Sequence, residues 1–187
     1  MDVEEESTVA ALKRAIHESE QLGVGVSLSL ILGHRKLDVD NLSLAEAGIE
    51  EGTTVIVVKH QLPAVLTASR DGTAKIWNAS TGECTQTLCG HSGTVNSAVF
   101  SHDGSSVLTA SEDATAKIWN ASTGECTRTL SGHSGAVMSA VFSGDGSSVL
   151  TASHDRTAKI WSASTGECTQ TLSGHSGWMT SAIFSTN

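Results

Sequence analysis

A 42-residue repeat is the sequence feature that most constrains how this chain can fold. Residues 65–106 match the segment 107–148 (VLTASEDATAKIWNASTGECTRTLSGHSGAVMSAVFSGDGSS) at all but seven of 42 positions, and residues 149–187 carry a third copy that stops three residues short. Near-identity at a fixed period excludes a single irregular core. It predicts one supersecondary unit that is stacked on copies of itself.

Each copy contains four short segments with the character of β-strands. In the middle copy they are 107–111, 115–119, 126–130 and 136–142, and they are separated by turns rich in Gly, Ser and Asp. Segment 126–130 alternates with period 2, and no segment shows helical periodicity. Four strands per 42 residues is the pattern of a propeller blade.

The unit resembles a WD40 repeat in its Gly-His pair, in its turn Asp and in a Trp six residues after that Asp. The Trp-Asp pair that names the family is Trp-Asn at 77 and 119 and Trp-Ser at 161, which is a minor departure. The resemblance implies a buried network of the His, a strand hydroxyl, the Asp and the Trp. Carried over by motif position, the networks are His91, Thr109, Asp113 and Trp119; His133, Thr151, Asp155 and Trp161; and, if the last strand completes the first blade, His175, Thr67, Asp71 and Trp77.

The hydroxyl is open in this assignment, because Ser111 and Ser153 lie on the same strand face as Thr109 and Thr151. A hydroxyl, a His and an Asp can also act as nucleophile, base and orienting group. The set recurs in every copy, however, and includes an indole that has no role in acyl transfer. We therefore predict a structural network, with no catalytic residue, no cofactor and no metal site.

Residues 1–60 lack the repeat and show different patterns. Val9, Leu12 and Ile16 share one face of an expected helix with Thr8 as its N-cap, and strands are expected at 28–33 and 53–59. This order resembles the ubiquitin-like fold from its helix onward, over about 50 residues. The first hairpin of that fold is missing, because only seven residues precede Thr8. The fold class is thus a truncated α+β ubiquitin-like domain (1–60) followed by all-β WD40 repeats (61–187, divided as 65–106, 107–148 and 149–187).

The segment 53–59 has two possible uses. Val55–His60 aligns without a gap with Ser97–His102, the register of a first blade strand, but Ile49 stands where the Gly-His pair should place its His. We therefore favour the ubiquitin-like sheet, so that the repeats begin with a second strand at Val65 and finish with an inner strand, Trp178–Phe184. Three blades are too few to close a ring. Either two chains form a six-bladed homodimer, or the sequence is a piece of a longer protein.

Composition limits the partners. The net charge is −9 with no basic stripe, so nucleic acid and anionic membranes are poor partners. No signal peptide and no apolar run approaching 18 residues is present, which predicts a cytoplasmic location and leaves the nucleus open. Three of the four cysteines recur at the repeat interval, so a disulfide or zinc framework is not expected.

The few positions at which the copies differ suggest a partner-binding face. Four sets of such positions lie in the connections between strands two and three and between strands four and one, which open on the same face of a propeller. Neutral drift in exposed loops is the alternative. The candidate partner-binding residues are Arg70, Glu112, His154, Arg156, Asn96, Met138 and Trp178.

These patterns predict a non-catalytic scaffold or adaptor that binds proteins or peptides and is linked to the ubiquitin pathway. One alternative is a structural repeat fragment without activity of its own. Another is a hydrolytic or metal-dependent enzyme, but the eight histidines form no H-x-x-x-H or H-E-x-x-H pair and no G-x-S-x-G motif occurs.

Overall fold

The computed structural model describes residues 9–19, 26–32, 35–37, 43–47, 49, 55–61 and 64–185. The chain divides into two compact units, Met1–Pro63 and Ala64–Asn187. We describe each unit by itself.

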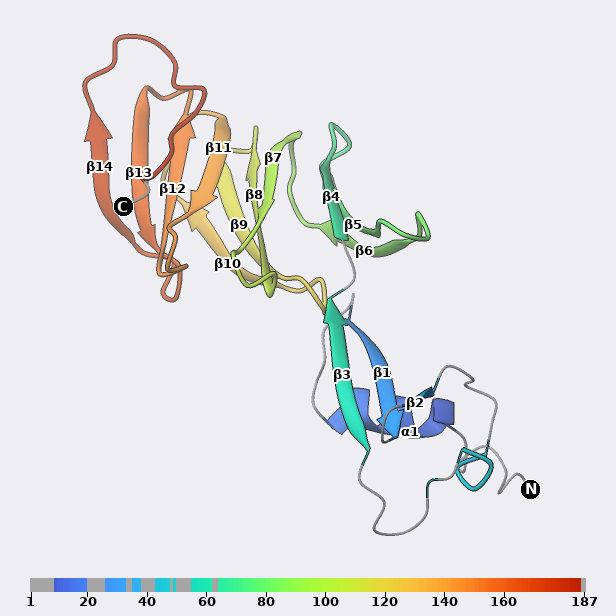
Figure 1. The fold of residues 1–187 in the computed structure, drawn as a ribbon. Helices are drawn as coiled ribbons and strands as arrows, with labels where there is room; N and C mark the ends of the chain where they lie inside the picture. Colours follow the sequence, from blue (N-terminus) through green and yellow to red (C-terminus); the bar gives the residue numbers. More distant parts are fainter. Residues whose placement is uncertain are drawn as a thin grey trace. The chain divides into compact units, whose positions relative to one another are not determined.

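The first unit packs one helix against a small antiparallel sheet (Figure 1). Its elements are the helix α1 (Val9–Ser19) and the strands β1 (Val26–Leu32), β2 (Arg35–Leu37) and β3 (Ile56–Gln61), with the sheet order β2-β1-β3. Val9 from the helix and Leu30 from the central strand are fully buried, with Leu12 and Ile16 packed against them. The helical face expected from the sequence is therefore the face that covers the sheet. The N-cap expected at Thr8 lies outside the described residues.

A short turn at Ser43–Ala47 completes this core. The Ser43 amide donates to the Glu46 carboxylate at 3.0 Å, and the Glu46 amide donates back to the Ser43 hydroxyl at 3.2 Å. This reciprocal pair is a capping box, which starts a helical turn. The turn places Ala47 in the core, where it is fully buried.

Strand β3 belongs to the first unit. It pairs with β1 from Ile56, opposite Ile31, to Gln61, opposite Val26. The sheet of the first unit therefore uses the strand for which the sequence allowed two roles.

The second unit consists of three antiparallel sheets that follow one another along the chain (Figure 1). We call them blades 1, 2 and 3, and we call the first strand of a complete blade its inner strand. Blade 1 contains β4 (Ala64–Ala68), β5 (Thr73–Asn78) and β6 (Cys84–Cys89); blade 2 contains β7 (Val95–Phe100), β8 (Ser106–Ser111), β9 (Thr115–Asn120) and β10 (Cys126–Ser131); blade 3 contains β11 (Val137–Phe142), β12 (Ser148–Ser153), β13 (Thr157–Ser162) and β14 (Cys168–Ser173).

The apolar cores of this unit lie between neighbouring blades. One core joins Ile76 and Leu88 of blade 1 to Val107 and Trp119 of blade 2. A second core joins blades 2 and 3 in the same way and includes Trp161. Since each apolar face is covered only by the next copy, a single blade cannot bury its own core.

The two ends of the repeat array differ from its middle. Blade 1 has three strands, because no described strand lies on the free side of β4. The expected inner strand Trp178–Phe184 is not a strand in this structure. The physical reason is that a strand needs a partner for its backbone hydrogen bonds, and no described strand edge is paired with it.

Candidate interaction site

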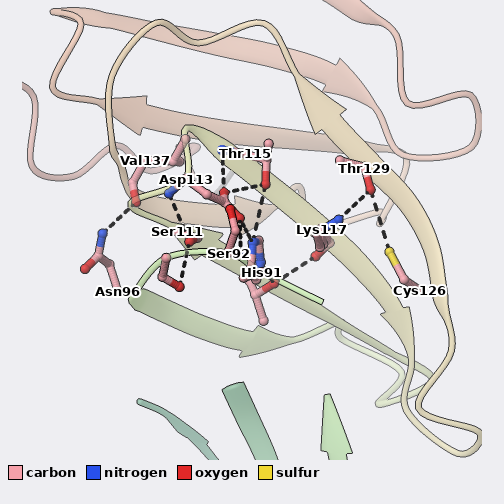
Figure 2. A network of polar contacts seen from close by, with 12 residues as sticks. His91, Ser92, Asn96, Ser111, Asp113, Thr115, Lys117, Cys126, Thr129 and Val137 are labelled. Carbon is pink, nitrogen blue, oxygen red and sulfur yellow. Dashed lines mark hydrogen bonds and ion pairs between the residues drawn. The ribbon is translucent and has the colours of Figure 1, made fainter. Parts of the chain in front are cut away.

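A network of four side chains lies in blade 2, at its joint with blade 1, and Figure 2 shows its His91 and Asp113. The His91 Nδ1 lies 2.8 Å from the Asp113 Oδ2, and its Nε2 lies 2.7 Å from the Thr109 Oγ1. The Trp119 indole N–H donates to the same hydroxyl at 2.9 Å. His91 comes from the connection after β6, whereas the other three come from β8, β9 and the turn between them. The network therefore fixes the crossing from one blade to the next.

The same network occurs one repeat later. His133 Nδ1 lies 2.7 Å from Asp155 Oδ2, and His133 Nε2 lies 2.8 Å from Thr151 Oγ1. Trp161 donates to the Thr151 hydroxyl at 2.9 Å. The structure thus brings together the two complete sets that the sequence grouped, with the threonine supplying the hydroxyl in each.

The serines that share the strand face have another role. The Ser111 hydroxyl donates to the Gly93 carbonyl at 3.2 Å and accepts from the Asp113 amide at 3.1 Å. Ser153 makes the equivalent bonds to Gly135 and Asp155. These serines hold the turn that carries the aspartate.

Proton positions in the network follow from the partners available. Burial lowers the pKa of His91, although the neighbouring Asp113 opposes this, so the neutral imidazole is favoured. Burial by itself raises the pKa of the Asp113 carboxyl, but hydrogen bonds from Thr115, His91 and Ser92 outweigh it and lower the pKa to about 2. A neutral imidazole then donates from Nδ1 to the carboxylate and accepts the Thr109 proton at Nε2. Every polar atom of the network has a partner.

The arrangement resembles a nucleophile, base and acid triad but is closed to substrates. Thr109 and Thr151 have no exposed surface. Each hydroxyl also accepts an indole N–H at 2.9 Å, so its oxygen is already engaged as an acceptor. The network geometry therefore supports a structural role.

Blade 1 holds an incomplete version of the network. Trp77 donates to Thr67 at 2.8 Å, and the Asp71 carboxylate accepts from the Thr73 amide and hydroxyl at 2.9 and 2.7 Å. No described residue supplies an imidazole to Asp71 within this chain. His175 is exposed and lies outside this network, because the segment that would carry it there is not paired.

The candidate partner-binding positions lie in the β8–β9 turn, the β12–β13 turn and their counterparts, and at or just before the starts of β7, β11 and their counterpart in the last copy; we call this side of the second unit the rim. The β8–β9 turn contacts the segment before β7 through the Glu112 amide, which donates to the Thr94 carbonyl at 2.9 Å. One repeat later the His154 amide donates to the Ala136 carbonyl at 2.9 Å. Backbone bonds between the turns and the connections therefore place the variable side chains side by side.

Trp178 is the most prominent side chain of this rim. Its indole stacks on the His154 ring, with ring centroids 4.7 Å apart and an angle of 20° between the planes. Even so, 70% of its surface is exposed. Arg70, Glu112 and Arg156 are exposed as well, whereas Met138 is half-buried.

Two of the candidate positions contact each other across blades. The Asn96 amide group donates to the Val137 carbonyl at 3.0 Å and lies 3.5 Å from the Met138 sulfur. These two residues are partly engaged in joining the strands β7 and β11. They are weaker candidates for partner contact than the exposed members of the rim.

A hollow of about 650 Å³ lies between blades 2 and 3, at the strand ends that are opposite to the rim. It is lined by Asp103, Asp145 and Arg128, among others. Sequence reasoning missed this region, although position 128 differs between the copies. Arg128 donates to the Ser164 carbonyl at 2.9 Å, so it is used to join the blades.

We also searched the described part of the chain for a metal site and for a membrane-spanning helix. No group of three or more His, Cys, Asp or Glu side chains there could hold a metal ion. Nor does any described helix combine the length and the apolar character needed to cross a bilayer.

Comparison with known families gives two matches. The family described as WD domain, G-beta repeat matches residues 54–78, 82–120 and 124–162, together more than half of the chain. The Ubiquitin family matches residues 1–62. A comparison with curated proteins found no match. The fold class predicted from the sequence, a ubiquitin-like segment followed by three blades of WD40 type, is thereby confirmed.

Proposed function

Because the chain belongs to the WD domain, G-beta repeat family and carries a ubiquitin-family segment, we propose that it is a non-catalytic protein-interaction scaffold. The rim that carries Trp178 binds a protein or peptide partner. The ubiquitin-like unit links this partner to receptors of the ubiquitin pathway.

The observation that carries the proposal is that buried and exposed positions of the blades have different roles. The residues that recur in blades 2 and 3 form closed networks, whereas four of the residues that differ between copies, Arg70, Glu112, Arg156 and Trp178, are exposed at one rim. An indole that is 70% exposed is a typical interface anchor. The imidazole beneath it holds the ring in place, which lowers the entropy that binding would cost.

Backbone strain at the rim supports the same interpretation. Gly72, Ala114 and Arg156 occupy equivalent turn positions with φ of 83°, 65° and 70°. Only glycine adopts this conformation without a steric cost, which is about 1 kcal/mol for other residues. A long cation held at such a position presents its side chain on the rim at the expense of stability.

The test is capture of partners by the immobilised 187-residue chain and by its Trp178→Ala variant. Loss of an anchor costs about 2 kcal/mol, or roughly a 30-fold weaker Kd. Ile56→Ala is the matched control, because Ile56 is an exposed apolar residue, 54% accessible, on β3 of the first unit and therefore outside the rim. Equal capture by both variants and the parent chain would refute the rim as the binding face. Absence of any partner would favour an inert repeat fragment.

The ubiquitin-like unit is tested separately. Ile56 lies on the edge strand β3 with 54% of its surface exposed, which makes it a candidate contact for ubiquitin-pathway receptors. We expect Ile56→Ala to weaken binding to a panel of ubiquitin-binding domains and to leave rim-dependent capture unchanged.

The proposal includes a cytoplasmic location. All four cysteines, Cys84, Cys89, Cys126 and Cys168, are free and exposed. Exposed free thiols suit a reducing compartment. Imaging of the tagged chain tests this part.

A further inference from the structure

The two ends of the second unit are incomplete in complementary ways. Strand β4 has the sequence VLTA at its core, as β8 and β12 do, but on one side it has no neighbour among the described strands. Val65 is also 46% exposed, whereas Val107 and Val149 at the same repeat position pack against the preceding blade and are fully buried. Blade 1 therefore has an open strand edge with unpaired backbone groups.

The segment 178–185 is the piece that lacks a sheet. By the 42-residue offset it is the counterpart of β7 and β11, and Ile183 on it is 79% exposed. The start of this segment makes the same backbone contact with the preceding blade as the start of β7 does. The Met179 amide donates to the Ser153 carbonyl at 3.2 Å, as the Val95 amide donates to the Ser69 carbonyl at 3.0 Å.

We propose that the segment 178–185 of a second copy of this chain adds to the free edge of β4 as the missing inner strand of blade 1. The register follows from the pairs that β7 makes with β8, namely Ala98↔Thr109 and Phe100↔Val107. The same offset places Ala182 of the partner subunit opposite Thr67 and Phe184 of the partner subunit opposite Val65.

The second copy would also complete the polar network of blade 1. His175 of the partner subunit enters as His91 and His133 do, with its Nδ1 toward Asp71 and its Nε2 toward Thr67. The surroundings of the glycine that precedes each histidine support this. A Cβ on Gly90 would lie 3.3 Å from the Trp119 ring, whereas one on Gly174 has no neighbour within 4 Å. Trp77, which would face Gly174 of the partner subunit, is correspondingly half-buried, whereas Trp119 is 1% exposed.

The same chain offers one competitor for the edge of β4, which is its own strand β3. By the repeat offset, Ile56 and Val58 correspond to Ala98 and Phe100, so β3 could fill the position in cis. That use would break its pairing with β1 and would bring Ile49, which cannot donate to Asp71, to the place of the imidazole. Only a second copy supplies both the strand and the His.

Reciprocal exchange between two copies yields a closed assembly. Each chain contributes three blades and completes blade 1 of its partner, so the two chains form a ring of six blades with two equivalent junctions. A two-fold ring leaves no strand edge of this kind open, and six blades lie within the range in which propellers close.

Cross-linking tests the register directly. In a chain whose four cysteines are replaced by Ser, Val65→Cys combined with Phe184→Cys should give an intermolecular disulfide, because residues directly opposite in antiparallel strands are close enough to bridge. Val65→Cys with Ile183→Cys is the control, since a one-residue slip points that side chain to the other face. The expected result is a covalent two-chain species for the first pair only. Equal yields, or a disulfide within one chain, would overturn the proposal.

Light scattering tests the assembly and the role of His175. We expect a mass of twice 19.3 kDa for the unmodified chain and dissociation at a roughly tenfold or higher concentration for His175→Ala, because a charge-assisted bond is lost at each junction. Asp71→Asn should add little to His175→Ala if the two side chains bond each other. A one-chain mass at the highest soluble concentration, or additive effects, would refute the exchange. Since neither variant alters Trp178, partner capture remains an independent readout.

Discussion

Replacing Thr109 by Val is the sharpest test of the network in blade 2. The hydroxyl of Thr109 accepts the Trp119 indole N–H at 2.9 Å and lies 2.7 Å from the His91 Nε2. Valine has the same shape, but it leaves the Trp119 indole N–H and the His91 Nε2 without the Thr109 hydroxyl as a partner, at a position with no exposed surface. Each buried group left unsatisfied costs about 1–3 kcal/mol, and the added methyl group returns about 0.8 kcal/mol. We therefore expect the free energy of unfolding to fall by roughly 2–4 kcal/mol.

The repeat provides a matched control for this substitution. Thr67 occupies the same position in blade 1, but it is exposed and makes only the bond from Trp77 among the network groups. Thr67→Val should therefore cost only about 0.5–1 kcal/mol. The comparison is best made in the His175→Ala chain, so that no imidazole from another copy can reach Thr67.

The assay is urea unfolding followed by tryptophan fluorescence. All four tryptophans lie in the second unit, so the signal reports on the blades alone. A loss of about 3 kcal/mol shifts the urea midpoint by roughly 1–2 M at ordinary slopes, and circular dichroism checks that the shift does not reflect a local change around Trp119. Equal shifts for Thr109→Val and Thr67→Val, or none for either, would refute the reasoning that the hydroxyl is the centre of the network.

Two further predictions follow from the same geometry. Because burial lowers the pKa of His91 and His133 in the folded chain, protons bind the unfolded chain more readily below about pH 6.5. The free energy of unfolding should therefore be at its maximum above about pH 6.5 and should fall as the pH drops through the lowered pKa values. Replacing both histidines by Gln should make the thermal midpoint depend less on pH between about pH 7.5 and 5. An unchanged pH dependence of the midpoint would contradict the assignment. At the turn positions with positive φ, Ala114→Gly should raise the free energy of unfolding by about 0.5–1 kcal/mol. Arg156→Gly should do the same but weaken partner capture, and a stabilised Arg156→Gly chain that still captures normally would remove the arginine from the binding face.

The repeated part of the fold could be predicted closely from the sequence. Alternation and turn residues marked strands at 115–119 and 126–130, and the structure has them at Thr115–Asn120 and Cys126–Ser131. These signals are local, since side-chain period and turn chemistry act within a few residues. Repetition added the register, because a contact between neighbouring copies recurs at the same offset.

The choice between two hydroxyls could not be made from the sequence. Thr109 and Ser111 share one strand face, and their different roles depend on where the imidazole arrives from the neighbouring connection. The contact between Asn96 and Met138 was also hidden, because it joins equivalent positions of two inner strands. Both cases depend on how blades pack, which no local pattern contains.

The stretch 54–62 shows most clearly where local patterns stop deciding structure. Both family matches include it, since one ends at residue 62 and the other begins at residue 54. Its alternation suits either sheet, so the choice depends on which edge gives the larger gain in paired backbone and buried surface. Pairing with β1 gives six residues of β3 a partner strand for their backbone hydrogen bonds, and it keeps Ile49 packed against the first core. The edge of β4 is thereby left for another strand that follows a histidine. Strands β7 and β11, which follow His91 and His133, are already paired, so among the described repeat segments the one after His175 is left for this edge.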